Sequence, residues 1–135
     1  MLELVIDEIR FEAAHYLPGH GKCGYIHGHT YVIRDLRIKV EETDSLGISI
    51  DFGAIKEALR FFDHKLFVPS RDLEAWKNAS LPGVDSSRII AIDPAPSVEK
   101  ISTYVRTYLA SKFGIPESNI RFKLYEGLNQ GVEIR

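Results

Sequence analysis

The segment from His15 to His29 constrains most strongly how this chain can fold. It holds four of the five histidines and the only cysteine. His27 and His29 are two residues apart, so on a β-strand both side chains leave the same face. His15 ends the preceding alternating stretch, and in an antiparallel pair it can approach the other two across the ladder. The spacing therefore favours two long paired strands with three histidines at one end.

A cluster of three neutral imidazoles is typical of a catalytic zinc site, which leaves one coordination position open. A water or a substrate hydroxyl bound there would become acidic, because the metal stabilises its oxyanion. The plainer alternative is that His27 and His29 are surface side chains at the end of a strand. His20 is interpreted as an ordinary loop histidine.

Cys23 has two interpretations that the sequence leaves open. It is either a fourth ligand, which would close the site as a structural one, or a reactive thiolate beside the metal. Its glycine and lysine neighbours indicate an exposed loop rather than the surroundings of a buried, inert cysteine.

Composition limits the class of protein. The chain has 135 residues, is 44% hydrophobic and carries a formal net charge of -2, which is typical of one globular domain over residues 1–135. A charge this close to neutral argues against a nucleic-acid-binding protein. No apolar run approaches the roughly 20 residues that span a bilayer, and the first residues do not resemble a secretion signal. A single cysteine excludes an internal disulfide, so we expect a cytoplasmic protein. From the charge and the short apolar runs we expect neither nucleic acid nor a membrane as a partner.

Hydrophobic periodicity predicts four strands and two helices. The expected elements are, in chain order, a strand over Leu2–His15, a strand from His27 to about Glu42, a helix capped by Asp51 and running to about Asp63, a helix from Ser97 to Gly114, and strands over Ile120–Glu126 and Val132–Arg135. The order ββααββ predicts an α+β fold, in which a four-stranded antiparallel sheet carries both helices on one face. Residues 69–96 are long and polar, with one short strand candidate over residues 88–92.

Alternation along the two long strands makes finer predictions. In the first strand, Val5, Ile9 and Phe11 share one face with His15, and the charged Asp7 interrupts that face. In the second strand, residues 31 and 33 are apolar on the histidine face, whereas residues 36, 38 and 40 are apolar on the opposite one. A β-bulge near residues 34 and 35 would bring both sets to one face.

Other polar residues are candidates for chemistry. Either His64 is a helix-terminal histidine favoured by the dipole, or the adjacent Asp63 holds it as a proton carrier. Glu126 is either at the open end of its strand or positioned to accept two parallel hydrogen bonds from the amidine-like edge of a guanine or pterin ring. Ser97 and Glu99 are interpreted as a helix cap and a first-turn acid.

Several short motifs occur together in one order. They are Phe11-Glu12-Ala13-Ala14-His15, Cys23-x-x-x-His27-Gly28-His29, Asp51-Phe52, Asp63-His64, Pro96-Ser97-Val98-Glu99 and Glu126. With them the chain closely resembles the family of 6-pyruvoyl-tetrahydropterin and 6-carboxy-tetrahydropterin synthases, over nearly its whole length. The cysteine-to-HGH spacing joined to the upstream Phe-x-Ala-Ala-His is the most specific part of this resemblance.

The resemblance implies the tunnelling fold, in which subunits join edge to edge into a trimeric barrel and two trimers usually stack into a hexamer. It also implies active sites between subunits, one Zn²⁺ per subunit and a set of site residues. These are His15, His27 and His29 as zinc ligands, Cys23 as the base, Asp63 and His64 as a proton relay, Glu126 as the acid that grips the pterin, and Ser97 and Glu99 as further substrate contacts.

The resemblance further implies 7,8-dihydroneopterin triphosphate as the substrate. The motifs look most like those of the 6-carboxy-tetrahydropterin enzymes of 7-deazaguanine (queuosine or archaeosine) synthesis, which release acetaldehyde and triphosphate. The alternatives are a 6-pyruvoyl-tetrahydropterin synthase and a non-catalytic pterin- or purine-binding protein of the same fold. A cupin-like oxygenase fits less well, because residues 31–36 lack the expected Glu. Two departures from the family pattern are Phe67-Val68, where Asn is frequent, and Ser97 in place of Thr.

Overall fold

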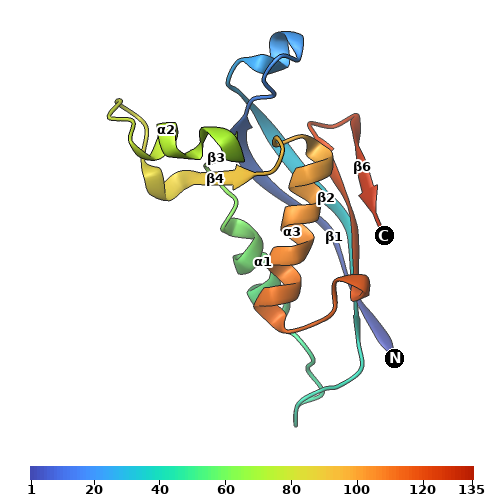
Figure 1. Cartoon of the computed structure of the whole chain (residues 1–135). Coiled ribbons are helices and arrows are strands. Elements are labelled where there is room, and N and C mark those ends of the chain that lie inside the picture. Colours follow the sequence, from blue (N-terminus) through green and yellow to red (C-terminus); the bar gives the residue numbers. More distant parts are fainter.

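The computed structural model describes residues 1–135 and combines a six-stranded mixed sheet with three α-helices (Figure 1). The strands are β1 (Leu2–His15), β2 (His27–Val40), β3 (Lys65–Pro69), β4 (Ile89–Ile92), β5 (Ile120–Glu126) and β6 (Gln130–Ile134). The helices are α1 (Phe52–Arg60), α2 (Leu73–Lys77) and α3 (Val98–Phe113). The sheet order is β4-β3-β1-β2-β5-β6, and α1 and α3 lie against one face of it. The predicted α+β class is confirmed.

The predicted four-stranded antiparallel sheet is wrong in its number of strands and in their direction. β3 pairs with β1 in parallel, and β4 pairs with β3 in parallel. The short apolar run of β3 has no alternation, because its residues 67–69 are buried, and such runs cannot be recognised as strands by a period of two. The strand candidate over residues 88–92 is confirmed as β4, and the order of elements becomes ββαβαβαββ.

The predicted β-bulge in β2 is confirmed. The register between β2 and β5 shifts between Arg34 and Arg37, and Asp35 has a positive φ of 52°. Residues 31 and 33 before the bulge and residues 36, 38 and 40 after it are all buried. One extra residue therefore keeps the apolar side chains of a 14-residue strand on the core side.

The predicted buried face of β1 is wrong at its beginning. Val5 is 40% exposed, whereas Ile6 is buried. The register between β1 and β2 is continuous here, with Ile6 opposite Leu36 and Glu8 opposite Arg34. β1 therefore changes its buried face at Asp7, opposite the bulge of its partner strand.

Both long helices begin at the predicted caps. The side chain of Asp51 accepts a hydrogen bond from the Ala54 N–H at 3.1 Å, and that of Ser97 accepts one from the Lys100 N–H at 3.2 Å. α3 ends at Gly114 in the left-handed conformation that glycine adopts easily. The buried stripes of the helices pack on the aromatic centre of the sheet, so the start of α3 is held beside the end of β1.

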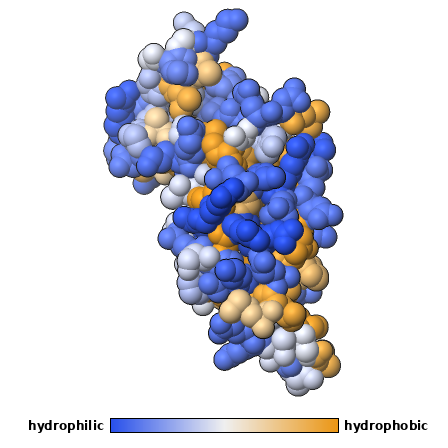
Figure 2. Space-filling view, turned by 90° about the vertical axis from the view of Figure 1, so that its right-hand side faces the viewer, coloured by the Kyte–Doolittle hydropathy of each residue, from blue (hydrophilic) through white to orange (hydrophobic).

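The sheet face without helices is mainly charged. Ion pairs join Glu8 to Arg10 at 2.8 Å and Asp35 to Arg37 at 2.9 Å. Figure 2 shows the side of the molecule that carries β6, where hydrophilic side chains dominate and hydrophobic ones form small separate patches. None of the helices is both long and apolar enough to cross a membrane.

Candidate active site and metal centre

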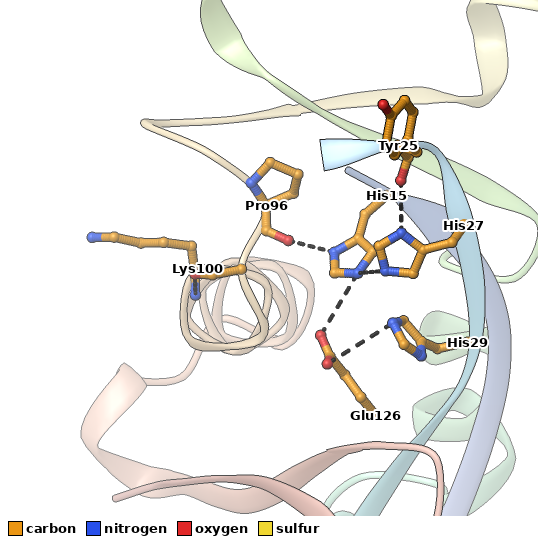
Figure 3. Close-up of polar contacts among 8 residues, drawn as sticks. His15, Tyr25, His27, His29, Pro96, Lys100 and Glu126 are labelled. Atoms are coloured by element: carbon orange, nitrogen blue, oxygen red, sulfur yellow. Dashed lines mark hydrogen bonds and ion pairs between the residues drawn. The ribbon is translucent and has the colours of Figure 1, made fainter. Parts of the chain in front are cut away.

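Three histidines meet where β1 ends and β2 begins. The antiparallel register places His15 opposite His27 and Ala13 opposite His29. One ring nitrogen from each histidine lies within 4.8 Å of the other two, so the three imidazoles form a group that can hold a metal ion. Nε2 of His15 is 3.1 Å from Nε2 of His27 (Figure 3). The predicted clustering of the three histidines is confirmed.

Two of these imidazoles are oriented by backbone carbonyl groups. Nδ1 of His15 donates to the Pro96 carbonyl at 2.6 Å, and Nδ1 of His27 donates to the Tyr25 carbonyl at 2.7 Å (Figure 3). A carbonyl oxygen can only accept, so in the neutral rings Nδ1 carries the hydrogen and Nε2 carries the lone pair. Two lone pairs that face each other at 3.1 Å need a cation or a proton between them. The histidine cluster therefore fits a metal ion, with its carbonyl partners as the outer support.

Burial keeps His15 neutral. It lowers the pKa of His15 to about 4, against the opposing effect of the hydrogen bond to Pro96, and positive charge on His27 or His29 would lower the pKa further. A neutral imidazole is the form that binds metal ions. Three neutral nitrogen ligands with one open position are the arrangement of a catalytic zinc site.

Glu126 faces the histidine cluster from the end of β5. Its Oε1 is 3.8 Å from Nε2 of His15, and its Oε2 is 3.9 Å from Nε2 of His29 (Figure 3). The side chain is 17% exposed. These distances are longer than hydrogen bonds, so the carboxylate stands beside the open side of the cluster and keeps acceptor capacity for another group.

Tyr31 forms the floor of the cluster, a role that the sequence did not indicate. Its ring lies 6.0 Å from that of His15 and 5.6 Å from that of His29, and it stacks on Phe11. Its hydroxyl is buried and has no hydrogen-bond partner. Burial, and then the charge of Glu126, raise the pKa of Tyr31, so this hydroxyl stays neutral.

The start of α3 contacts the cluster through a residue that the sequence did not single out. Pro96, which accepts the hydrogen bond from His15, comes directly before the cap Ser97. The side chain of Ser97 is engaged in capping, and Glu99 lies exposed in the first turn. The interpretation of Ser97 and Glu99 as cap and first-turn acid is therefore confirmed, and both lie at the helix end that adjoins the histidines.

Asp63 and His64 form a hydrogen-bonded pair. Nδ1 of His64 is 2.8 Å from Oδ2 of Asp63, and Oδ1 of Asp63 accepts from the Glu12 N–H at 2.8 Å. The Glu12 N–H holds the pKa of Asp63 below its ordinary value, and His64 adds to this shift. No hydrogen bond or ion pair joins this pair to the three histidines of its own subunit.

His64 of this pair lines a groove of about 1060 Å³. Glu12, Ala14 and Thr30 line the groove and alternate along β1 and β2 with Ala13, His15, His27 and His29, so their side chains point to the opposite face of the sheet. Ala13 and His29 border the groove as well. His64 and the side chains of the histidine cluster thus lie largely on different faces of the sheet, and His29 is the cluster residue that also borders the groove.

Cys23 lies in a short 3₁₀ turn over Gly21–Gly24 and is half-buried. Its backbone carbonyl accepts from the Leu17 N–H at 2.6 Å. Neither Cys23 nor the exposed His20 belongs to the group of metal-ligating side chains. The cysteine therefore does not close the histidine cluster in this structure.

A network of hydrogen bonds anchors the segment between β3 and β4 beside the site. The Tyr16 hydroxyl donates to Asp72 at 2.7 Å and accepts from the Trp76 indole at 2.8 Å. Tyr16 directly follows His15, so α2 is held near the end of β1. Phe67 and Val68, which depart from the family pattern, are fully buried in β3 and belong to the core.

Comparison with known proteins agrees with this fold and site. A family model described as 6-pyruvoyl tetrahydropterin synthase matches residues 5–135, and the chain belongs to this family. It is 32% identical to 6-carboxy-5,6,7,8-tetrahydropterin synthase of Rickettsia felis and 33% identical to that of Rickettsia typhi, in each case over 93% of this chain and 95% of the relative.

Solved structures of low sequence identity share the fold. The 6-pyruvoyl tetrahydropterin synthase of Plasmodium falciparum superposes with a TM-score of 0.65 at 20% identity, and that of Plasmodium vivax with 0.65 at 19%. Each match covers 98% of this chain and 96% of the other. The resemblance seen in the sequence motifs is confirmed, and family membership supports an enzyme that acts on pterins.

Proposed function

We propose that this protein is a zinc-dependent lyase that converts 7,8-dihydroneopterin triphosphate and one water molecule to 6-carboxy-5,6,7,8-tetrahydropterin, with release of acetaldehyde and triphosphate. The observation that carries the proposal is the cluster of three histidines beside Glu126, in which carbonyl groups orient the Nε2 lone pairs of His15 and His27 toward each other. The relatives named 6-carboxy-5,6,7,8-tetrahydropterin synthase support this product over a 6-pyruvoyl one. We place the activity in the cytoplasm, in 7-deazaguanine synthesis.

His15, His27 and His29 would hold the zinc, which when bound acidifies the hydroxyl groups of the substrate side chain. Glu126 can accept two parallel hydrogen bonds from the amidine-like edge of the pterin. This contact would fix the ring so that its side chain reaches the open side of the cluster. Ser97 and Glu99, at the adjoining end of α3, would border the ring.

Proton transfer is assigned to two groups. Cys23 as a thiolate would remove the proton from the side-chain carbon next to the ring, since the histidine cluster leaves its sulfur free. His64, with its Nδ1 hydrogen held by Asp63, would return a proton elsewhere on the side chain during tautomerisation. Loss of Cys23 would prevent the removal of the proton, and loss of His64 would prevent its return in the same reaction.

We further propose that the working enzyme is a homo-oligomer, a trimeric barrel or a pair of stacked trimers. The supporting observation is that His64 lines the groove, whereas His15 and His27 do not, since alternation along β1 and β2 turns the cluster side chains to the other face of the sheet. The Asp63–His64 pair of a neighbouring subunit could reach the histidine cluster that the pair of the same chain cannot reach. The edge strands β4 and β6 leave backbone groups free for pairing between subunits.

The decisive experiment is incubation of the purified protein with 7,8-dihydroneopterin triphosphate, followed by mass spectrometry of the products. We expect acetaldehyde and a 6-carboxy pterin. A 6-pyruvoyl product would transfer the assignment to the alternative synthase. Tight binding of an unchanged substrate would contradict the lyase and identify a pterin-binding protein.

A further inference from the structure

The groove on the open face of the sheet contains two positive charges that the proposed reaction leaves without a role. Lys65 and Arg88 both line it. Neither takes part in any of the ion pairs of the molecule. The Lys65 ammonium lies 4.4 Å from the centre of the Phe61 ring. The Arg88 guanidinium forms no hydrogen bond, whereas the Arg88 backbone N–H donates to the Asp85 carbonyl.

The pairing of two parallel strands brings these cations together. Leu66 of β3 is paired with Ile89 of β4 in parallel. Lys65 and Arg88 each come one residue before this pair, so they are neighbours across the two segments. The Ser87 N–H is the main reason that the pKa of Asp85 is below its ordinary value, and Arg88 and Lys65 both contribute to the same shift. Both positive charges therefore act at one end of the groove.

Glu12 and Asp85, the acidic side chains that line the groove, and Asp63, the partner of His64, already have hydrogen-bond donors. Glu12 accepts from the Thr30 hydroxyl at 2.9 Å, Asp63 accepts from Glu12 and pairs with His64, and Asp85 accepts from the Ser87 N–H at 3.0 Å. The guanidinium and the ammonium are the groups left with unused donors. An anion is the ligand that satisfies them.

We propose that Lys65 and Arg88 bind the polyphosphate tail of the substrate, next to the relay imidazole of His64. The inference rests on the proposed function for the identity of the ligand. His64 directly precedes Lys65, so a substrate side chain that reaches the imidazole extends its terminal phosphates to the two cations. The guanidinium of Arg88 can donate two parallel hydrogen bonds to a phosphate, and Lys65 supplies a point charge.

Binding of inorganic tripolyphosphate to the intact protein, measured by calorimetry, tests the site without turnover. We expect Arg88→Gln and Lys65→Gln each to raise the Kd about tenfold, which corresponds to about 1.4 kcal/mol. Lys112→Gln removes the same charge from the exposed end of α3 and should leave the Kd unchanged. The Kd of Arg88→Lys for tripolyphosphate should lie between that of wild type and that of Arg88→Gln. Thermal midpoints equal to that of wild type would show that each variant is folded.

A wild-type protein that does not bind tripolyphosphate would overturn the proposal, as would variants that bind it as tightly as Lys112→Gln does. In the turnover assay the two variants should raise KM for the triphosphate substrate much more than they lower kcat. Tripolyphosphate binding that depends on both cations, in a protein that converts no pterin, would retain the anion site and reject the proposed lyase. Turnover with an unchanged KM in both variants would retain the lyase and reject this site.

Discussion

Cys23 is the residue on which the proposed chemistry depends most directly. Its thiol lies outside the group formed by His15, His27 and His29, and its loop is joined to the end of β1 through the hydrogen bond from Leu17. A ligand and a base make opposite demands on the sulfur, because a ligand is bound to the metal in every state and a base must be free to take a proton. Metal content therefore separates the two roles.

We expect Cys23→Ala to keep one zinc per subunit and to lose turnover. The loss should exceed about a hundredfold, the lower range for removal of a group that transfers a proton. Zinc is measured by atomic emission after gel filtration, with His29→Ala as the variant that should lose metal. Loss of zinc from Cys23→Ala in proportion to that of His29→Ala would show that the thiol is a ligand.

Asp63 links the relay to stability through its lowered pKa. The Glu12 N–H and then His64 favour its ionised form in the folded protein. A carboxyl whose pKa is lower folded than unfolded stabilises the protein above the unfolded pKa, and this contribution disappears as the pH falls through the folded value.

The difference in unfolding free energy between wild type and Asp63→Asn should therefore be greatest near neutral pH and shrink below about pH 4. Urea unfolding at a series of pH values measures it. A difference that does not change with pH would show that the carboxyl has an ordinary pKa in the folded protein.

At the level of elements, the N-terminal caps of α1 and α3 make the same hydrogen bond, but only the cap of α3 lies beside the histidine cluster. Asp51 and Ser97 each accept a hydrogen bond from the third residue after them. The start of α1 has no contact with the histidine cluster in the hydrogen-bond network, whereas Pro96, next to Ser97, orients His15. Fraying at the start of α3 would therefore disturb the orientation of His15, a proposed zinc ligand.

Asp51→Ala and Ser97→Ala should each lower the unfolding free energy by about 1 kcal/mol, the usual loss for a cap. Only Ser97→Ala should also weaken zinc binding, measured by competition with a chelator, and Ser97→Thr should restore both properties. Equal zinc affinity in the two alanine variants would mean that the cap does not position His15.

At the level of the whole molecule, the sheet separates two groups of functional residues. The side chains of the histidine cluster lie on the core side at the end of β1 and β2, and His64, paired with Asp63, lines the groove of the other face, which His29 also borders. The proposed reaction would then combine the histidine cluster of one subunit with Asp63 and His64 of another. Mixed oligomers of two inactive variants test this arrangement.

Cys23→Ala and His64→Ala should each be inactive alone and regain activity when they are unfolded together and refolded. If the subunits mix at random, roughly a quarter of the sites combine an intact Cys23 with an intact His64 from the neighbour. A mixture that stays inactive, although native mass spectrometry shows mixed oligomers, would place the relay and the thiol of each site in one chain.

Local spacing was enough to predict much of this protein. The two-residue period of a strand places His27 and His29 together, and a hairpin register brings His15 to them. Caps and apolar stripes located α1 and α3, and the change of phase in β2 located the bulge at Asp35. These features depend on residues close in the chain or on one antiparallel pair, where side-chain direction follows from backbone geometry.

Other features were decided only by the tertiary structure. β3 is a short buried strand whose parallel partner β1 lies far away in the sequence, so alternation does not reveal it. The sequence did indicate a strand at β4, but not its parallel pairing with β3. Pro96 meets His15 across 81 positions, and a backbone carbonyl leaves no signal in the side-chain pattern. The sequence by itself determined which residues gather as ligands, because that depends on period and register. Only packing decided which face of the sheet each group occupies and which cations stand beside the relay.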